Sequence, residues 1–435
     1  MRVRLFLVLG SSAIGTCLAA QPVPPARALG PITAVSAPGE LGAVSMVRAL
    51  STGAVLVNDV TRRQLVLFDK NLVKRKVIAD STIETGKSYG SALGGLLAFS
   101  GDTSLFVDPT TLSMLVIDPN GEVARVMSVP STKDVQSMIG GPFGTPALDM
   151  KGRIVCRTVL KPQPLVVMSG KSAAKSTLSV QTDDSALIYR IDIRTRATDS
   201  LTYVRIPSES RSLSVDERDN RTLHIRRNPL PVVDDWAVMS DGRVAIVRGA
   251  DFHVEWFGLD GSAVSTPRVP FPWERLSDEA KERLVDSLQA DASRRRRERE
   301  SQLRSNPGST PRSTDGFEAS LPIVVVNGYM QSEGPPRVPG RRETIMDPPS
   351  VKLLPDYRPA FRIGSARGDA EGNLWVRTTT PSDAGAIYAV ISPNGTLIDS
   401  VKVPFGRVIA GFAAGTVYLG VLDGKGARLE RASVR

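Results

Sequence analysis

The sequence predicts an all-β fold built from six units of four antiparallel strands, and three observations support this prediction. First, five stretches repeat a pattern of β-branched or aromatic strand, polar turn and second strand; the clearest is Met114–Val123, and the others begin at Leu65, Ile188, Val254 and Ile387. Second, Gly supplies positive φ at several of the turns, while Asp or Ser bonds back to its own backbone. Third, a further strand precedes each hairpin, and a sixth such strand stands near the C-terminus, with starts near residues 54, 104, 153, 243, 373 and 416.

The spacing of these strands suggests how the units are arranged. The first three starts and the last pair are ~45–50 residues apart, which suits one four-stranded propeller blade. We therefore expect a six-bladed β-propeller over residues 31–435. The sixth unit ends after three strands, and Pro31–Ala37 is expected to supply the fourth, closing the ring without free sheet edges. A two-sheet sandwich accommodates six four-strand repeats poorly.

The first twenty residues, Met1–Ala20, match a secretory signal peptide. Arg2 and Arg4 precede a short apolar core, and Leu18–Ala20 offers small residues for cleavage. No later stretch approaches 18 apolar residues, so no membrane-spanning helix is predicted. We therefore expect an exported protein, periplasmic or extracellular.

A lipoprotein signal is the alternative interpretation. Ile14–Cys17 resembles a lipobox, in which Cys17 would carry the lipid anchor, although Thr16 is atypical before that cysteine. In either case Gln21–Gly30 is expected to be a Pro-rich tether. The other cysteine, Cys156, stands in an apolar strand and is expected to be a small buried hydrophobe, so no disulfide is predicted.

Charge and turn residues agree with an exported β protein. The chain of 435 residues contains 37 Gly and 31 Pro and has a net charge of +10. Removing the first twenty residues, with two Arg and no acids, leaves about +8, and residues 294–312 contribute +5 from seven Arg and two Glu. The run Arg294–Arg297 is interpreted as a solvated helix end, with binding to anionic lipid or to an acidic partner as the alternatives. Export argues against a nucleic-acid partner.

Three long insertions, about 160–186, 208–232 and 270–357, interrupt the later blades. They fall where connections emerge on one face of a propeller, so we expect them to gather over one mouth of the central channel. The largest is expected to hold a helix over about 277–303, with Ser277 as N-cap, and a disordered segment over about 305–316. One helix face should pack on the propeller; it carries Leu276, Ala280, Leu284, Val285, Leu288 and Ala292.

Sequence motifs for catalysis or metal binding are weak. Gly86–Ser88 and Gly170–Ser172 lack the earlier glycine of a phosphate-binding loop, and Ser172–Lys175 matches S-x-x-K without companion motifs. Asp216–Asn220 lacks the Gly and Glu of a known calcium loop and is interpreted as solvated charge.

Only two histidines occur, His224 and His253. A three-histidine zinc site is therefore excluded, and a Ser-His-Asp triad would depend on one of these two. His253 begins a strand of the fourth unit, where a structural or exposed role is expected. Any ligand site should be lined by residues just before the innermost strands, which we expect to be Tyr89, Phe143, Asp234, Asp235, Tyr357, Arg358 and Arg407.

The whole mature chain resembles the six-bladed β-propeller superfamily of the NHL-repeat and TolB-like type, and looks like a bacterial secreted member. Asp369–Val376 and Ile387–Gly395 carry the resemblance best. These motifs are structural, so the resemblance implies a fold and little function. Related propellers include calcium-dependent lactonases, whose acid and Asn metal ligands are not recognisable here, and zinc-dependent lyases, whose three-histidine site is excluded.

The functional expectation is a non-enzymatic exported propeller that binds a peptide, protein or small envelope ligand at the capped mouth of its channel. No cofactor or metal is expected, and the protein is expected to be a monomer. The alternative is a metal-dependent hydrolase or lactonase of the same fold, which converging carboxylates or Asn at the mouth would favour. A purely structural envelope protein is a third possibility.

Overall fold

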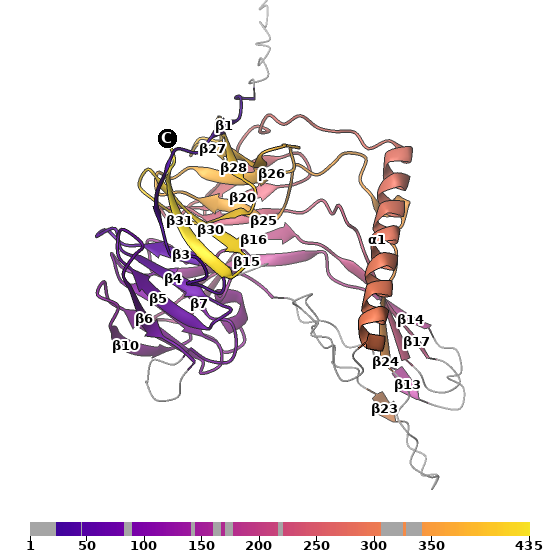
Figure 1. The fold of residues 1–435 in the computed structure, drawn as a ribbon, viewed down its shortest axis with the longest axis horizontal. Helices are drawn as coiled ribbons and strands as arrows, with labels where there is room; N and C mark the ends of the chain where they lie inside the picture. Colours follow the sequence, from indigo (N-terminus) through magenta and orange to yellow (C-terminus); the bar gives the residue numbers. More distant parts are fainter. Residues whose placement is uncertain are drawn as a thin grey trace, which may run out of the picture.

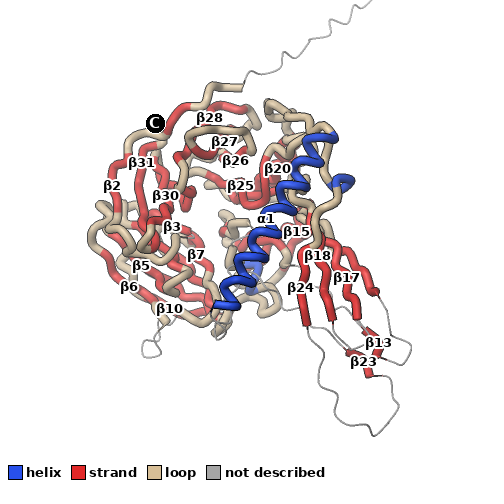
Figure 2. The backbone as a smooth tube through the Cα atoms, turned by 45° about the vertical axis from the view of Figure 1, so that its right-hand side comes forward, coloured by secondary structure: helices blue, strands red, loops and turns tan. Residues whose placement is uncertain are grey.

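The computed structural model describes residues 23–435 apart from 45, 82–88, 141–143, 160–166, 170–176, 216–220, 306–324 and 328–341. Its main body is a β-propeller, in which antiparallel sheets are arranged around a common centre (Figures 1 and 2). A smaller sheet and a long helix lie to one side of this body. No helix of the described part of the chain is long and apolar enough to cross a membrane.

Strands pair in chain order within each propeller sheet. The first sheet holds β3 (Met46–Ala49), β4 (Val55–Asp59), β5 (Gln64–Phe68) and β6 (Arg75–Ala79); the second holds β7 (Gly95–Ala98), β8 (Ser104–Asp108), β9 (Ser113–Ile117) and β10 (Val123–Ser128); the third holds β11 (Ala147–Leu148), β12 (Arg153–Arg157), β15 (Ser185–Asp192) and β16 (Thr198–Arg205). The fourth holds β19 (Asp235–Val238), β20 (Val244–Arg248), β21 (His253–Phe257) and β22 (Ala263–Ser265); the fifth holds β25 (Phe361–Gly368), β26 (Leu374–Thr378), β27 (Gly385–Ile391) and β28 (Leu397–Pro404); the sixth holds β29 (Arg407–Ala413), β30 (Thr416–Asp423) and β31 (Gly426–Ser433).

The N-terminal segment joins two of these sheets. β2 (Ile32–Val35) pairs antiparallel with β31, and β1 (Arg27–Ala28) pairs parallel with β28. The Arg27 guanidinium also lies 2.6 Å from the Asp399 carboxylate. The stretch expected to be a tether over 21–30 therefore ends in a strand, because its backbone completes hydrogen bonds along the edge of the fifth sheet.

The core is divided among the seams between neighbouring sheets. A cluster of buried apolar side chains lies between each consecutive pair of sheets, and another joins the sixth sheet to the first. Cys156 is buried in one of these clusters, as the sequence predicted. Each sheet is therefore stabilised by apolar contacts on both of its faces.

The described strands of the three long insertions do not cap the channel. Instead their strands pair with one another in a single sheet that extends away from the propeller in both views (Figures 1 and 2). Its strands are β14 (Thr177–Gln181), β17 (Glu209–Val215), β18 (Arg221–Arg227) and β24 (Arg342–Met346), and beyond them β13 (Val167–Ser169) pairs with β23 (Val325–Asn327). We call β14, β17, β18 and β24 the projecting sheet. The expectation of a capped mouth was wrong because these strands satisfy their backbone hydrogen bonds on each other.

The long helix, α1 (Asp278–Ser305), begins after Ser277, whose Oγ accepts a hydrogen bond from the Ala280 amide at 3.2 Å. Its buried residues pack in one cluster with Leu230 and Leu354, next to the short helix η3 (Val351–Leu353). α1 therefore packs on the insertions, not on the propeller as expected. The contact is confined to the first turns of α1, and Ala292 is exposed. The segment expected to be disordered, 305–316, lies outside the described residues after Ser305.

Candidate functional site

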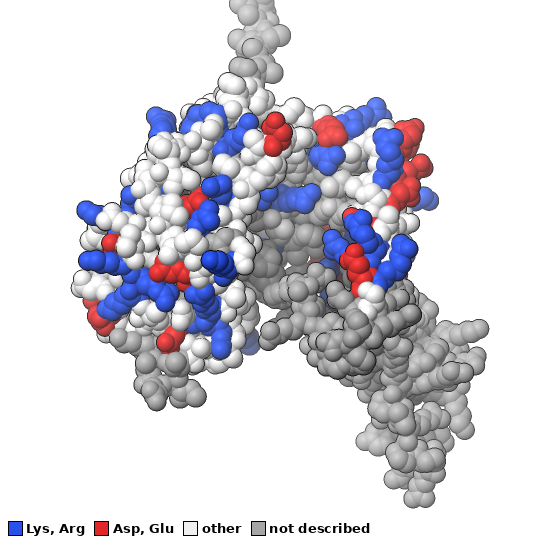
Figure 3. All heavy atoms as spheres, in the orientation of Figure 1, with Lys and Arg blue, Asp and Glu red and all other residues white. Residues whose placement is uncertain are grey.

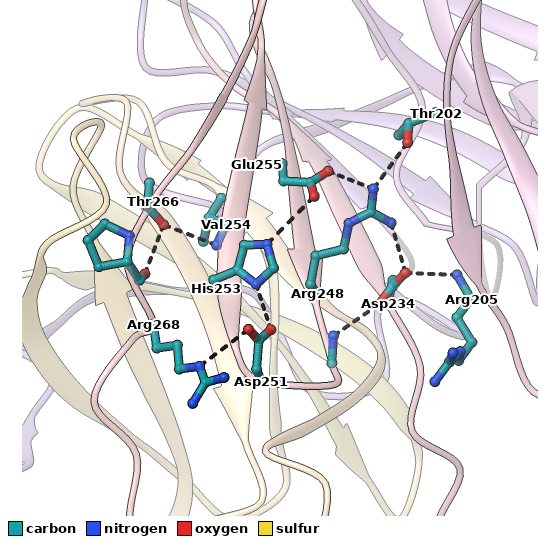
Figure 4. A network of polar contacts seen from close by, with 12 residues as sticks. Thr202, Arg205, Asp234, Arg248, Asp251, His253, Val254, Glu255, Thr266 and Arg268 are labelled. Carbon is teal, nitrogen blue, oxygen red and sulfur yellow. Dashed lines mark hydrogen bonds and ion pairs between the residues drawn. The ribbon is translucent and has the colours of Figure 1, made fainter.

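A carboxylate–histidine–carboxylate sequence stands at the start of β21. His253 and Glu255 lie two residues apart on β21, so their side chains point to the same face of the strand. Asp251 stands in the turn before the strand, and its carboxylate reaches the His253 imidazole. The pairing of β20 with β21 places Arg248 directly opposite His253 on that face. Figure 4 shows the four side chains converging there, with Asp234 beyond Arg248.

The imidazole of His253 lies between the two carboxylates. Its Nδ1 is 2.5 Å from Asp251 Oδ1, which is a hydrogen bond. Its Nε2 is 3.6 Å from Glu255 Oε1, which is longer than a hydrogen bond. The side chains of His253, Asp251 and Glu255 are 20%, 31% and 26% exposed, so solvent reaches this group.

Arg248 anchors the group to its surroundings. Its guanidinium donates to Glu255 Oε2 at 2.6 Å and to Asp234 Oδ2 at 2.9 Å (Figure 4). Burial alone would lower the pKa of Arg248, but its bonds to Glu255 and Asp234 outweigh burial and raise that pKa. Asp234 also accepts from the amides of Arg205 and Gly249. Arg248 therefore remains charged and holds Glu255 in place.

This arrangement suits general acid–base chemistry. A carboxylate on Nδ1 fixes the orientation of an imidazole and stabilises its protonated form, while Nε2 remains available to accept a proton. Arg268, whose side chain is 77% exposed, approaches Asp251 from outside at 3.4 Å. No serine or threonine hydroxyl is recorded against Nε2 within the described ranges, so a serine-type triad is not formed there.

The same group does not form a metal centre. Among the residues that the structure describes, no three His, Cys, Asp or Glu side chains are placed to hold a metal ion.

The residues predicted to line one mouth belong to separate local contacts. Tyr89 is buried; its hydroxyl donates to Asn58 Oδ1 at 2.9 Å and accepts from the Gly94 amide at 3.0 Å. Arg407 pairs with Glu430 at 2.7 Å within the sixth sheet. The Arg407–Glu430 pair joins β29 to β31 across β30, and the Tyr89 hydroxyl joins Asn58 of β4 to Gly94, the residue before β7.

Two other predicted residues, Tyr357 and Arg358, lie beside the start of the α1 segment. Tyr357 is half exposed and its ring is edge-on to Trp273, with centroids 6.5 Å apart. Arg358 pairs with Glu274 at 2.6 Å. Phe143 lies outside the described residues.

Asp234 and Asp235 are adjacent in sequence but serve different seams. Asp234 belongs to the network of Figure 4. Asp235 is 2% exposed and accepts the Ala366 amide of the fifth sheet at 2.7 Å. Burial raises the pKa of Asp235. Burial also lowers the pKa of the nearby Arg157 to about 10, although the negative charge of Asp235 acts to raise the pKa of Arg157. Asp234 is thus the one predicted residue that the structure places in the candidate site.

The sequence predicted a structural or exposed role for His253 and named Asp234, but not Arg248, Asp251 or Glu255. The signal was present, since three ionisable residues alternate over 251–255 at the start of a strand. Arg248 could not be identified in this way, because its position opposite His253 depends on the register between β20 and β21.

Comparison with known proteins finds similarity among solved structures only. No protein-family model and no curated protein matches the chain. Similar solved structures include a gluconolactonase from Xanthomonas campestris (10% identity, 95% of this chain and 99% of that chain, TM-score 0.36). They also include a virginiamycin B lyase from Staphylococcus aureus (9% identity, 90% of this chain and 96% of that chain, TM-score 0.36). A third is a calcium-binding protein, regucalcin, from Agrobacterium tumefaciens (10% identity, 94% of this chain and 97% of that chain, TM-score 0.39). At TM-scores below 0.5 this likeness carries no argument, and the propeller fold follows from the strand pairing of this chain.

The expectation of a non-enzymatic binding protein is corrected by these neighbours. Two of the three are named as enzymes, a lactonase and a lyase, so the prediction of a non-enzymatic protein is not kept. The likeness assigns no reaction to this chain and no role to any of its residues. The contacts of His253 indicate which chemistry this chain can perform.

Proposed function

We propose that this protein is a hydrolase that cleaves small esters or lactones, with His253 as its general base. The observation that carries the proposal is the hydrogen bond of 2.5 Å between Nδ1 of His253 and Oδ1 of Asp251, with Nε2 beyond hydrogen-bond distance of Glu255. The surrounding contacts support it, because Arg248 pairs with Glu255 and holds this carboxylate, while Nε2 of the imidazole forms no hydrogen bond with it.

In the proposed reaction, Nε2 of His253 takes a proton from a water molecule as the water oxygen attacks the carbonyl carbon. Asp251 stabilises the imidazolium that forms. The tetrahedral intermediate then breaks its bond to the alkoxy oxygen, which receives the proton back from Nε2. An ester gives an acid and an alcohol, and a lactone gives one hydroxy acid. Proton transfer passes through this chain's own residues and needs no metal.

The experiment compares the two histidines of the chain. Hydrolysis of p-nitrophenyl acetate and γ-butyrolactone is followed in wild type, His253→Gln and His224→Gln. His224 is a matched control because its Nδ1 also contacts an aspartate, Asp347, at 3.0 Å, but in the projecting sheet. We expect His253→Gln to lose ~10²–10⁴-fold in kcat/KM and His224→Gln to remain near wild type.

Three outcomes would contradict the proposal. One is the absence of any hydrolysis above the buffer rate. Another is equal activity in both variants. The third is a His253→Gln variant that melts earlier but reacts as fast as wild type, since the network would then be only a structural anchor. Activity lost on treatment with a chelator, with stoichiometric calcium or zinc in the untreated protein, would favour the metal-dependent alternative.

We also propose that the six sheets are the six blades of one closed propeller of the NHL-repeat or TolB-like type. The pairing of β2 with β31 supports closure, because the N-terminal strand then completes the last blade. Apolar contacts between the sixth and first sheets support it as well.

Export to the periplasm or beyond stays a proposal based on Met1–Ala20, with an anchor at Cys17 as its alternative; both lie outside the described residues. We also propose, from the sequence alone, that the protein is a monomer and that it has no nucleic-acid partner. Figure 3 shows Lys and Arg interspersed with Asp and Glu over the visible propeller surface, which suits a solvated protein.

A further inference from the structure

A cavity of about 320 Å³ lies at the seam between the fourth and fifth sheets. It exists because β22 has three residues whereas β28 has eight, so the outer part of β28 has no strand of the fourth sheet facing it. The chain after β22 and the N-terminal residues Val23, Pro24 and Ala26 form the remaining walls. Ligand cavities are commonly ~300–1,000 Å³, so this one suits a small molecule.

Most of the lining is apolar. Phe252 and Phe271 contribute aromatic rings with centroids 5.8 Å apart, edge to face, and the opposite wall carries Ile387, Ala389 and Leu397. The interior therefore favours an aliphatic or aromatic body over a polar one.

One cation faces this apolar space. Ser400 and Lys402 lie two residues apart on β28, opposite Ala389 and Ile387 on β27, so their side chains share the face that lines the cavity. Lys402 is half-buried, and no ion pair with a residue of the described ranges is recorded for it. A partly desolvated ammonium next to apolar walls gains most from an anionic ligand. Asp383, the acid of the lining, is exposed, where water screens its charge.

We propose that this cavity binds a small carboxylic acid with an aliphatic or aromatic body. The carboxylate pairs with the Lys402 ammonium, and the body packs against Phe252, Phe271 and Leu397. This site is separate from His253, whose side chain points to the other face of β21, toward the third sheet (Figure 4). The inference therefore does not depend on the proposed hydrolase.

Calorimetric titration with hexanoate and with the neutral hexanamide tests the assignment. We expect hexanoate to bind more tightly than hexanamide to the wild type. Lys402→Met keeps most of the aliphatic stem and removes the charge, so hexanoate should weaken ~10-fold or more while hexanamide is unchanged. Lys352→Met is the matched control, since Lys352 is exposed on η3 and does not line the cavity. It should bind both ligands as the wild type does.

Two further variants separate charge from shape. Asp383→Asn should bind hexanoate as tightly as the wild type or more tightly, because a like charge is removed. Ala389→Leu places extra volume in the cavity and should weaken both ligands, with folding checked by its melting temperature. Equal binding of hexanoate and hexanamide by the wild type, or full hexanoate affinity in Lys402→Met, would overturn the proposal. Weaker hexanoate binding in Asp383→Asn would also overturn it, because the site would then select a zwitterion.

Discussion

Replacing Tyr89 by Phe removes one hydroxyl from the seam between the first two sheets. That hydroxyl is buried, donates to Asn58 Oδ1 at 2.9 Å and accepts from the Gly94 amide at 3.0 Å. The bond to Asn58 accounts for ~1 kcal/mol, and a buried amide left without its acceptor costs a further ~1–3 kcal/mol. We therefore expect Tyr89→Phe to lower the free energy of unfolding by about 2–4 kcal/mol.

Equilibrium unfolding in urea, followed by tryptophan fluorescence, measures this loss. Tyr203→Phe is the matched control, because its side chain is 65% exposed and should change stability by less than ~0.5 kcal/mol. A double-mutant cycle with Asn58→Ala isolates the Tyr89–Asn58 bond. If Tyr89→Phe is as stable as Tyr203→Phe, the hydroxyl does not join the two sheets and the argument fails.

Two other predictions concern buried ionisable groups. Burial raises the pKa of Asp235, so its contribution to stability is present at low pH and is lost as the pH rises through the pKa of the folded state. The melting temperature of Asp235→Asn should therefore rise relative to that of the wild type between pH 4 and pH 8. A difference in melting temperature that stays constant over this range would contradict the prediction. Burial also raises the pKa of the Cys156 thiol to about 12. In a Cys17→Ser chain, a disulfide reagent should therefore label no thiol at pH 8 until urea unfolds the protein. Rapid labelling of the native protein would show that the seam around Cys156 is open.

The strands of the propeller were readable from the sequence because their signals are local. Gly121 and Gly395 take positive φ at hairpin tips, where the Asp118 and Ser392 that start these turns also predicted them. Apolar alternation on both sides of these tips then marked the strands. Such features depend on a few neighbouring residues, so one sequence is enough to find them.

The candidate site and the projecting sheet were not readable in this way. Asp234 and Asp235 were placed together at a mouth, but adjacent residues point to opposite faces, and they reach the Arg248 network and the Ala366 amide respectively. β18 pairs with β24, more than a hundred residues later, and neither strand has a local signal for that partner. Register and long-range pairing decided both outcomes.

The projecting sheet also constrains the order of folding. In the sequence, β14 lies between β12 and β15 of the third sheet. β17 and β18 lie between β16 and β19, and β24 lies between β22 and β25. Its edges can meet only after the third, fourth and fifth sheets have brought these segments close, and contacts between distant segments form slowly. We expect this sheet to assemble last and to open first, so amide exchange in β18 should be faster than in the β20 strand of the body.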